Sequence, residues 1–481
     1  MRTATHRYSD IDVRGNTAIV ITATGQLETY LASFSEFQKT ATGRDLGWLR
    51  KLREDAFARF YEAGFPTTRD EDWRFTNVSP IAKASFKLAA AVPNQVSTEN
   101  IEAYELPGAA CQLVFVNGHF ARELSSFGDL PSGVRVNALA DEIKASPAAL
   151  ESHLGRYLDT HRDAFAALNT AFLNEGAYIH IRKGTVLEKP IHVLFISTAA
   201  DAPLMTHPRN LVVAEDESQL AIVEDYVSLS GGVAFCNTAT ELIAGESAVV
   251  SHYMLEREHT DTFNVSMLRI QQARSANVST HSILLGGGLV RNNVHSVLAG
   301  EGGECLINGL FIGTGRQHLD NYMLVEHAQP HCESRQFYNG ILDGKAHGVF
   351  HGRIIVHKDA QKTDAKQTNR NLLLSDDAQI DTKPQLEIYA DDVKCTHGAT
   401  IGQIEENALF YLRSRGIDEP SARKLLLLAF ANECLDRMKE ETVRTYLEEL
   451  INRHLFGMEH AAPALAAADG EDGGRNWKEV G

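Results

Sequence analysis

A cysteine and a histidine two residues apart form the most chemically suggestive pair in this chain of 481 residues. Cys395 and His397 are separated only by Thr396. If the segment is a strand, residues i and i+2 share a face, so the thiol and the imidazole would be neighbours. Both groups bind transition metals, but two ligands do not complete a coordination shell. The pair therefore predicts half of a metal site, which a second chain would complete.

Other histidines are concentrated in the same half of the sequence: His281, His295, His318, His327, His331, His347, His351 and His357. On a strand, His347 and His351 would share one face as residues i and i+4. Solvent-facing strand positions also tolerate histidine, and for each of these residues taken singly we prefer that interpretation.

Residues 340–346 resemble a phosphate-binding loop without being one. Gly340 and Gly344 are separated by three residues instead of four, and Ala346 has no hydroxyl group with which to ligate magnesium. We interpret the segment as a turn between strands. If the function of the protein requires ATP, we expect another chain to hydrolyse it.

Acidic pairs offer an alternative chemistry, because two carboxylates can cleave a glycosidic bond. The candidates are Asp376 with Asp377, Asp391 with Asp392, and Asp364. Sugar-cleaving solenoids are generally secreted, whereas the first residues here lack the apolar segment of a signal peptide. Acidic pairs are also common in turns, so this alternative is the weaker one.

The bulk composition indicates a globular protein with ample core, at 43% hydrophobic and 23% charged residues. A formal charge of −17 argues against binding to nucleic acid or to an anionic membrane. No run approaches the roughly 20 apolar residues that span a bilayer, and we expect a cytoplasmic location. The six cysteines include no Cys-x-x-Cys pair, so we expect free thiols, five of them buried.

Short alternating apolar runs separated by turn residues fill residues 170–402, which predicts many strands. Turn-like pairs recur with second residues at 218, 247, 276, 303, 346 and 377, in steps of 29, 29, 27, 43 and 31 residues. Such a period favours a β-solenoid, with an insertion in the long step, over a large β-sandwich.

Helices are predicted on both sides of this region. Residues 45–61 carry apolar side chains at helical spacing, and a short apolar run near residue 113 predicts a strand. Asp418 and Pro420 would begin a helix whose apolar stripe covers 422–438, and a second stripe follows at 443–455. We therefore divide the chain into a mixed, helical region (1–165), a β-helix core (166–402), a helical region (403–456) and a disordered tail (457–481).

Three segments resemble the SufB/SufD family of Fe–S cluster assembly proteins. They are Phe65-Pro66 with Glu71-Asp72-Trp73-Arg74-Phe75-Thr76; residues 165–172 with Lys189-Pro190-Ile191; and residues 338–417, including Gln367-Thr368-Asn369-Arg370-Asn371, Lys394-Cys395-Thr396-His397-Gly398-Ala399-Thr400-Ile401-Gly402 and Phe410-Tyr411-Leu412-Arg413-Ser414-Arg415-Gly416. The last two motifs are similar to those of the D paralogue, and the Cys-x-x-Cys motif typical of the B paralogue is missing.

The resemblance implies a right-handed parallel β-helix with helical ends, acting as a non-catalytic scaffold. It implies pairing with a SufB-type chain, or with a second copy when alone, and docking of a SufC-type ABC ATPase. Cys395 and His397 would face the partner chain as ligands for iron or a transient Fe–S cluster, with reduced flavin in the complex at an unknown site. The residues expected to contact the ATPase are Phe410, Tyr411, Arg413, Arg415, Leu425, Leu426 and Phe430.

Two alternatives remain at this point. A free-standing enzyme built on a β-helix would show turnover with this chain alone. A B paralogue, or a homodimeric member of the family, would retain a cluster without any partner.

Overall fold

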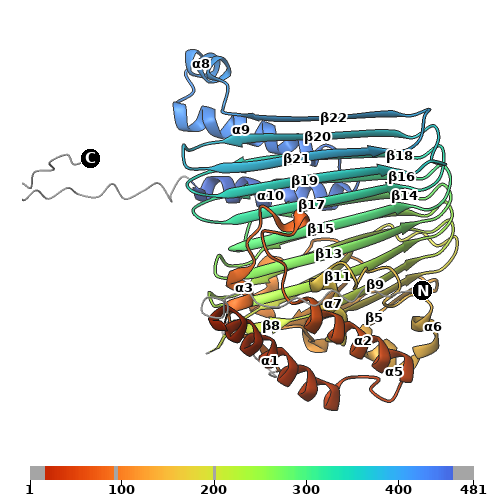
Figure 1. Cartoon of the computed structure of the whole chain (residues 1–481). Helices are drawn as coiled ribbons and strands as arrows, with labels where there is room; N and C mark the ends of the chain where they lie inside the picture. The colour runs from red at the N-terminus through yellow and green to blue at the C-terminus, as the bar shows by residue number, and fades with distance from the viewer. Residues whose placement is uncertain (1–16, 92–95, 199–201, 459–481) are drawn as a thin grey trace, which may run out of the picture.

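The computed structural model describes residues 17–91, 96–198 and 202–458. This part of the chain forms a β-solenoid of about eight coils with helices at both ends (Figure 1). The predicted mainly β fold is confirmed. Residues 459–481, most of the predicted tail, lie outside the described residues.

Two sheets form opposite walls of the solenoid, and successive strands of the coils alternate between them. Sheet A contains, in spatial order, β21 (Gln379–Ile388), β19 (His347–Val356), β17 (His318–His327), β15 (Leu289–Leu298), β13 (Phe263–Gln272), β11 (Ala234–Ala244), β9 (Arg209–Ala214), β6 (Ala177–Ile181) and β5 (Val134–Ala138), with β8 (Leu204–Thr206) beside β11 and β1 (Lys87–Leu88) beside β8. Sheet B contains β22 (Lys394–Gly402), β20 (Asp364–Leu373), β18 (Glu333–Leu342), β16 (Glu304–Gly313), β14 (Asn277–Leu284), β12 (Val249–Arg257), β10 (Gln219–Ser228), β7 (Ile191–Ser197), β2 (Cys111–Val116) and β3 (His119–Phe120), with β4 (Ser126–Phe127) beside β2. From β6 and β7 onward, neighbouring strands within each sheet are parallel.

The turns that lead from sheet A into sheet B stack along one edge, as the sequence period predicts. The residues that precede the registered strands of sheet B are Ser218, Ala248, Ala276, Gly303, Cys332, Thr363 and Val393, in steps of 27 to 31 residues. The predicted insertion is wrong. Residues 345–346 and 376–377 belong to the opposite edge, where β18 leads to β19 and β20 leads to β21, so the step of 43 residues is a change of edge.

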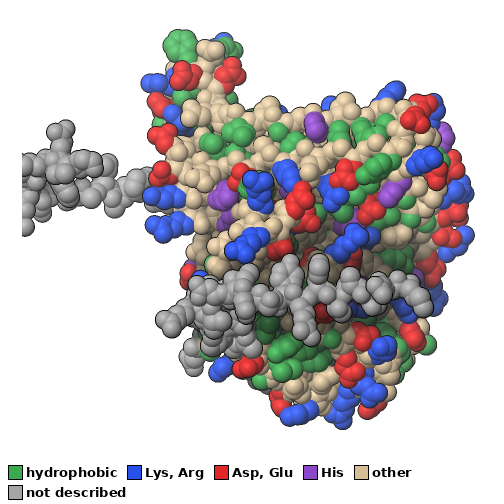
Figure 2. Space-filling view, viewed as in Figure 1, with side chains coloured by type: hydrophobic (Ala, Val, Ile, Leu, Met, Phe, Trp, Pro, Cys, Tyr) green, Lys and Arg blue, Asp and Glu red, His purple; other side chains and the backbone are tan. Residues whose placement is uncertain are grey.

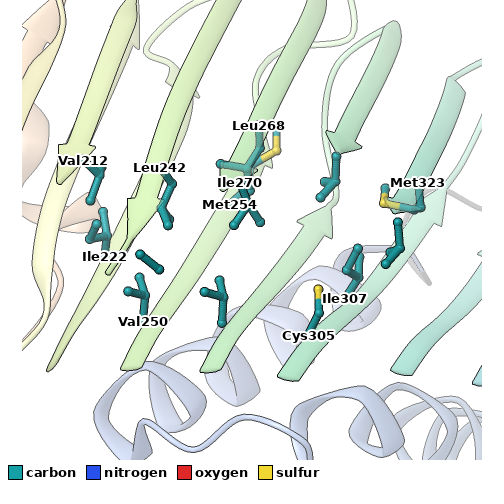
Figure 3. Packing of buried hydrophobic residues seen from close by; sticks show 14 of the residues in the cluster. Val212, Ile222, Leu242, Val250, Met254, Leu268, Ile270, Cys305, Ile307 and Met323 are labelled. Atoms are coloured by element: carbon teal, nitrogen blue, oxygen red, sulfur yellow. The ribbon is translucent and has the colours of Figure 1, made fainter. Parts of the chain in front are cut away.

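The interior between the sheets is filled by every second side chain of each strand. Figure 3 shows Val250, Ile307, Leu268 and Met323 pointing into this space from strands of both sheets. Five of the six cysteines are buried and Cys395 is half-buried, as predicted. The alternation of apolar residues in the sequence is therefore the alternation between interior and exterior.

Most of the N-terminal helices pack near one end of sheet A, and the short helix at residues 98–101 packs against sheet B. They are α1 (Thr17–Thr40), α2 (Gly47–Ala63), α3 (Ser79–Lys83), α4 (Thr98–Ile101), α5 (Leu139–Ala145), α6 (Pro147–Glu151) and α7 (Ala164–Ala171). α2 corresponds to the predicted helix and ends at Ala63, and the following Gly64 has a positive φ of 69°, which glycine adopts without strain. α7 begins where the Asp163 carboxylate accepts hydrogen bonds from two backbone N–H groups.

Residues 71–76 lie across the outer face of sheet A. Trp73 is buried, and the Arg291 guanidinium of β15 stacks over its ring at 4.0 Å. Thr76 Oγ1 lies 2.9 Å from His318 Nε2 on β17. Glu71 pairs with Lys383 on β21 at 3.0 Å. The segment therefore links the N-terminal region to successive coils, including the last one.

The C-terminal helices are α8 (Glu406–Ser414), α9 (Glu419–Leu435) and α10 (Glu441–Met458). α9 and α10 cover the outer face of sheet B, where Asn308 and Asn339 side chains donate hydrogen bonds to the carbonyl oxygens of Cys434 and Phe430 at 2.9 and 2.8 Å. The predicted cap of α9 is confirmed, since the Asp418 side chain accepts from Ser421 N. α8 has no buried residue and projects from the body (Figure 1). None of the helices in the described ranges combines the length and apolar character needed to cross a membrane.

Arg209 and Glu241 form a fully buried ion pair where β9, β11 and α7 meet, with Arg209 Nη2 at 2.8 Å from Glu241 Oε2. Replacing Arg209 with methionine leaves the Glu241 carboxylate buried without its counter-ion. We expect the free energy of unfolding to fall by about 3–5 kcal/mol, measured as a lower urea midpoint. Lys183→Met, which removes only surface ion pairs, is the control and should change stability by less than about 1 kcal/mol. Equal effects of the two substitutions would contradict this assignment.

Candidate functional site

Cys395 and His397 lie on β22, the last strand of sheet B, and share one face as predicted. In the parallel register, Cys395 is aligned with Ala365, Ser334 and Cys305, one residue from each of the three preceding coils; we call such a set of aligned residues a column. His397 likewise stands above Ile307 in its column. Figure 3 shows Cys305 and Ile307 in the interior of the solenoid. The shared face of Cys395 and His397 is therefore the inward face, at the end where no further coil follows.

The stack ends at β21 and β22, so the described chain leaves one long edge of β22 unpaired. Lys394 N donates to Thr363 O, and Thr400 O accepts from the Asn371 side chain of β20. Because the backbone groups of successive residues alternate in direction along a strand, even-numbered residues of β22 face β20. The N–H and C=O groups of residues 395, 397, 399 and 401 point to the free edge, where another strand can pair.

Polar side chains form the floor beneath His397. Gln367 lies directly below it in the register and donates a hydrogen bond to Gln336 in the next coil. Gly352 of the opposite sheet makes room for this pair, since a Cβ atom there would lie 2.0 Å from Gln367 Nε2. On β21, Thr382 Oγ1 is buried and has no hydrogen-bond partner among the residues that the structure describes. The open end thus combines a polar floor with the thiol and imidazole.

The two predicted ligands differ in their surroundings. His397 is exposed, and its side chain has no hydrogen bond or ion pair with any described residue. Cys395 is half-buried, and burial raises the pKa of its thiol, so the protonated form is favoured in the isolated chain. A bound metal ion would favour the thiolate. Within the described ranges, no group of three or more His, Cys, Asp or Glu residues is arranged to hold a metal.

The histidine pair on β19 has a different role. His347 and His351 share the outer face of the strand, as predicted, but each is hydrogen-bonded to a residue of β21. His347 Nε2 lies 2.8 Å from Asp381 Oδ2, and His351 Nε2 lies 2.7 Å from Gln385 Oε1. These imidazoles connect adjacent coils on the outside of the solenoid.

Exposed apolar side chains cluster near the open end and the C-terminal helices. Of the ten large hydrophobic side chains exposed among the described residues, six fall between residues 388 and 425: Ile388, Tyr389, Ile401, Phe410, Tyr411 and Leu425. Figure 2 shows hydrophobic side chains at the tip of the projection formed by α8. A concentration of this kind is typical of an interaction surface.

The residues predicted to bind an ATPase do not all lie on the surface. Phe410 is 73% exposed, Tyr411 and Leu425 are also exposed, and Arg415 lies over the Tyr411 ring at 3.6 Å. Arg413 is exposed and pairs with Glu419 at 3.2 Å. Leu426 is half-buried, whereas Phe430 is buried against sheet B. Phe430 therefore anchors α9, and its side chain is not available at the surface.

Sequence reasoning missed Ile401, Thr382 and Gln367 at the open end. Ile401 could have been found, because it continues the two-residue alternation from Cys395 and His397. Thr382 and Gln367 come from other strands, and only the register brings them to the same end.

Family models match most of the chain. The model described as "SufBD protein N-terminal region" matches residues 24–193, and "SUF system FeS cluster assembly, SufBD core domain" matches residues 195–430. The two matches meet within β7.

Curated relatives align over most of their own length. An iron–sulfur cluster assembly SufBD family protein of Synechocystis is 35% identical over 424 residues, covering 86% of this chain and 93% of the relative. SufD of Escherichia coli is 30% identical over 396 residues, covering 82% and 90%. SufD of Bacillus subtilis is 25% identical over 436 residues, covering 89% and 97%.

Proposed function

The chain belongs to the SufBD family of SUF-system Fe–S cluster assembly proteins, and from this we propose that it is the D-type scaffold subunit of an assembly complex. In this role it binds and positions other chains and catalyses no reaction by itself. The observation that carries the proposal is the open end of the solenoid, where an unpaired strand, exposed apolar residues and a Cys–His pair occur together.

A SufB-type chain pairs with the free edge of β22. Backbone pairing along β22 would satisfy the N–H and C=O groups that point away from β20. Ile401, which is 52% exposed, supplies apolar surface on the inward side of the same strand. When this chain is alone, a second copy covers the same edge and forms a homodimer.

Iron binds at this interface between the two chains as the substrate of cluster assembly. His397 Nε2 or Nδ1 and the Cys395 thiolate supply two ligands from this chain, and the SufB-type chain supplies the others. Because the metal ligands come from two chains, a change in the relative position of the chains brings the ligands together or separates them. We propose no site for flavin on this chain.

An ABC-type ATPase docks on α8 and the adjoining part of α9. Phe410, Tyr411 and Leu425 form the apolar centre, and Arg413 and Arg415 lie beside it. ATP hydrolysis takes place on that partner. Residues 340–346 form the end of β18 and a turn to β19, with no helix after the glycines to bind phosphate.

Replacing Phe410 with aspartate is expected to weaken ATPase binding by about 100-fold, because apolar residues at the centre of an interface contribute most of its affinity. Since α8 has no buried residue, the fold should be unchanged. Affinity for the purified ATPase can be measured by surface plasmon resonance. Leu31→Asp, at a residue of α1 that is 42% exposed, is the matched control and should bind normally. Normal binding by the Phe410 variant would mean that the ATPase binds to another surface of the chain.

A further inference from the structure

The column that ends at His397 contains two glutamines directly before it. In the parallel register, Gln336 of β18, Gln367 of β20 and His397 of β22 are aligned. Neighbouring strands lie about 4.8 Å apart, so aligned side chains on one face of a sheet are within reach of one another. Gln336 and Gln367 are 2% and 1% exposed, whereas His397 is exposed. The column therefore passes from two buried amides to a histidine at the open end.

The two amides form a short ladder, and one hydrogen bond sets its direction. Gln367 Nε2 donates to Gln336 Oε1. Both atoms lie against Gly352 of the opposite sheet, where a Cβ atom would be 2.0 Å from Gln367 Nε2 and 2.9 Å from Gln336 Oε1. In such a ladder, each amide donates to the side chain on one side and accepts from the side chain on the other. Since Gln367 donates to Gln336, its carbonyl oxygen is left for the next member of the column, which is His397.

Gln367 Oε1 is buried and has no hydrogen-bond partner within the part of the chain that the structure describes. A buried acceptor in this state calls for a donor. The Asn369 amide, at the next inward position of β20, already donates to Tyr338 O and accepts from Asn371 Nδ2. The His397 ring carries an N–H group that no described residue accepts. An acceptor and a donor that lack partners therefore occupy adjacent positions of one column.

A histidine that binds a metal through one ring nitrogen almost always donates the N–H group of the other to an oxygen atom. That outer hydrogen bond fixes the tautomer and the orientation of the ring. We propose that Gln367 Oε1 accepts the N–H group of His397, which leaves the other ring nitrogen unprotonated and free to bind iron. Gln367 is then a positioning residue that acts through His397. The use of this hydrogen bond rests on the proposed function, in which His397 is a ligand.

The hydrogen bond can be tested on the full-length chain alone through the tautomer ratio of the His397 ring. Long-range ¹H–¹⁵N NMR spectra of the chain labelled with ¹⁵N-histidine give this ratio at pH 8, where ordinary imidazoles are neutral. The His397→Ala variant identifies the signals. One hydrogen bond shifts an equilibrium by about fivefold, so the ratio should differ by about that factor from the ratio in N-acetylhistidine amide. Gln367→Met, which removes the acceptor, should return the ratio to that of the free amide.

Two further variants separate positioning from structural support. Gln336→Met removes the other, equally buried amide of the ladder and should keep the wild-type ratio. Gln367→Glu loses the bond to Gln336, as the methionine variant does, but keeps an acceptor oxygen, so it should also keep the ratio. A wild-type ratio equal to that of the free amide would overturn the proposal. So would equal changes in Gln336→Met and Gln367→Met. If Gln367→Met fails to fold, the wild-type ratio still decides.

Iron content of the assembled complex then connects the hydrogen bond to the proposed function. Gln367→Met should lower iron affinity by about 10–100-fold, and Gln367→Glu should restore most of it, with melting temperatures measured on the same samples. A tautomer ratio that responds to Gln367→Met while iron affinity stays unchanged would contradict the ligand role of His397 in the proposed function. An unchanged ratio, combined with iron loss in His397→Ala, would overturn the role of Gln367 and leave the proposed function standing.

Discussion

Replacing His397 with alanine is expected to remove most of the iron from the assembled complex while leaving this chain folded. His397 is exposed and has no side-chain partner among the described residues, so the substitution should change stability by about 0.5 kcal/mol or less. The bound iron would lose a direct ligand. Loss of an outer-shell partner already costs about 10–100-fold in metal affinity, so we expect at least a tenfold loss here.

Melting temperature, subunit composition and iron content should be measured on the same samples of the complex. The matched control is His161→Ala, at an exposed histidine of the loop before α7. A His397 variant that is stable and assembled but poor in iron supports the ligand assignment. A variant that melts early or fails to assemble defeats it, because iron loss would then follow from the missing complex.

Cys395→Ser should have a smaller effect on iron content if the SufB-type chain supplies the main thiolate. Cys395 is half-buried against the core, and serine nearly preserves its volume. The double variant should lose less iron affinity than the two single effects predict together, because ligands of one metal are coupled. Simple additivity would mean that the two side chains act at separate places.

The strands were predictable because interior and exterior alternate with period two, and the coil period was visible in the turns. The prediction failed at residues 345–346 because the turns at both edges of the solenoid use the same small and charged residues. Spacing alone cannot assign a turn to an edge. Only the hydrogen-bonded register does so, as where Lys345 N donates to Gly315 O.

The candidate site was predictable in part. The i, i+2 rule placed Cys395 and His397 together, but their inward orientation depends on the columns of three preceding coils. The helical stripe of α9 includes exposed Leu425 and buried Phe430, and periodicity does not distinguish the end that covers the sheet from the end left for a partner.

Replacing Ala399 with proline is expected to abolish pairing with the SufB-type chain. The N–H group of residue 399 points to the free edge of β22, so proline removes no hydrogen bond to β20. It does remove a donor from the edge and places a ring where the partner strand would pair. Ala399→Val is the matched control, since valine adds similar bulk and keeps the N–H group. Circular dichroism should show the same fold for both variants.

The most direct test of the account is native mass spectrometry of each variant co-expressed with the SufB-type chain and the ATPase. The account predicts that Ala399→Val is recovered with the SufB-type chain in equal amounts, and that folded Ala399→Pro is recovered without it. Recovery of the proline variant with a full complement of the SufB-type chain would contradict pairing at the open end of the solenoid.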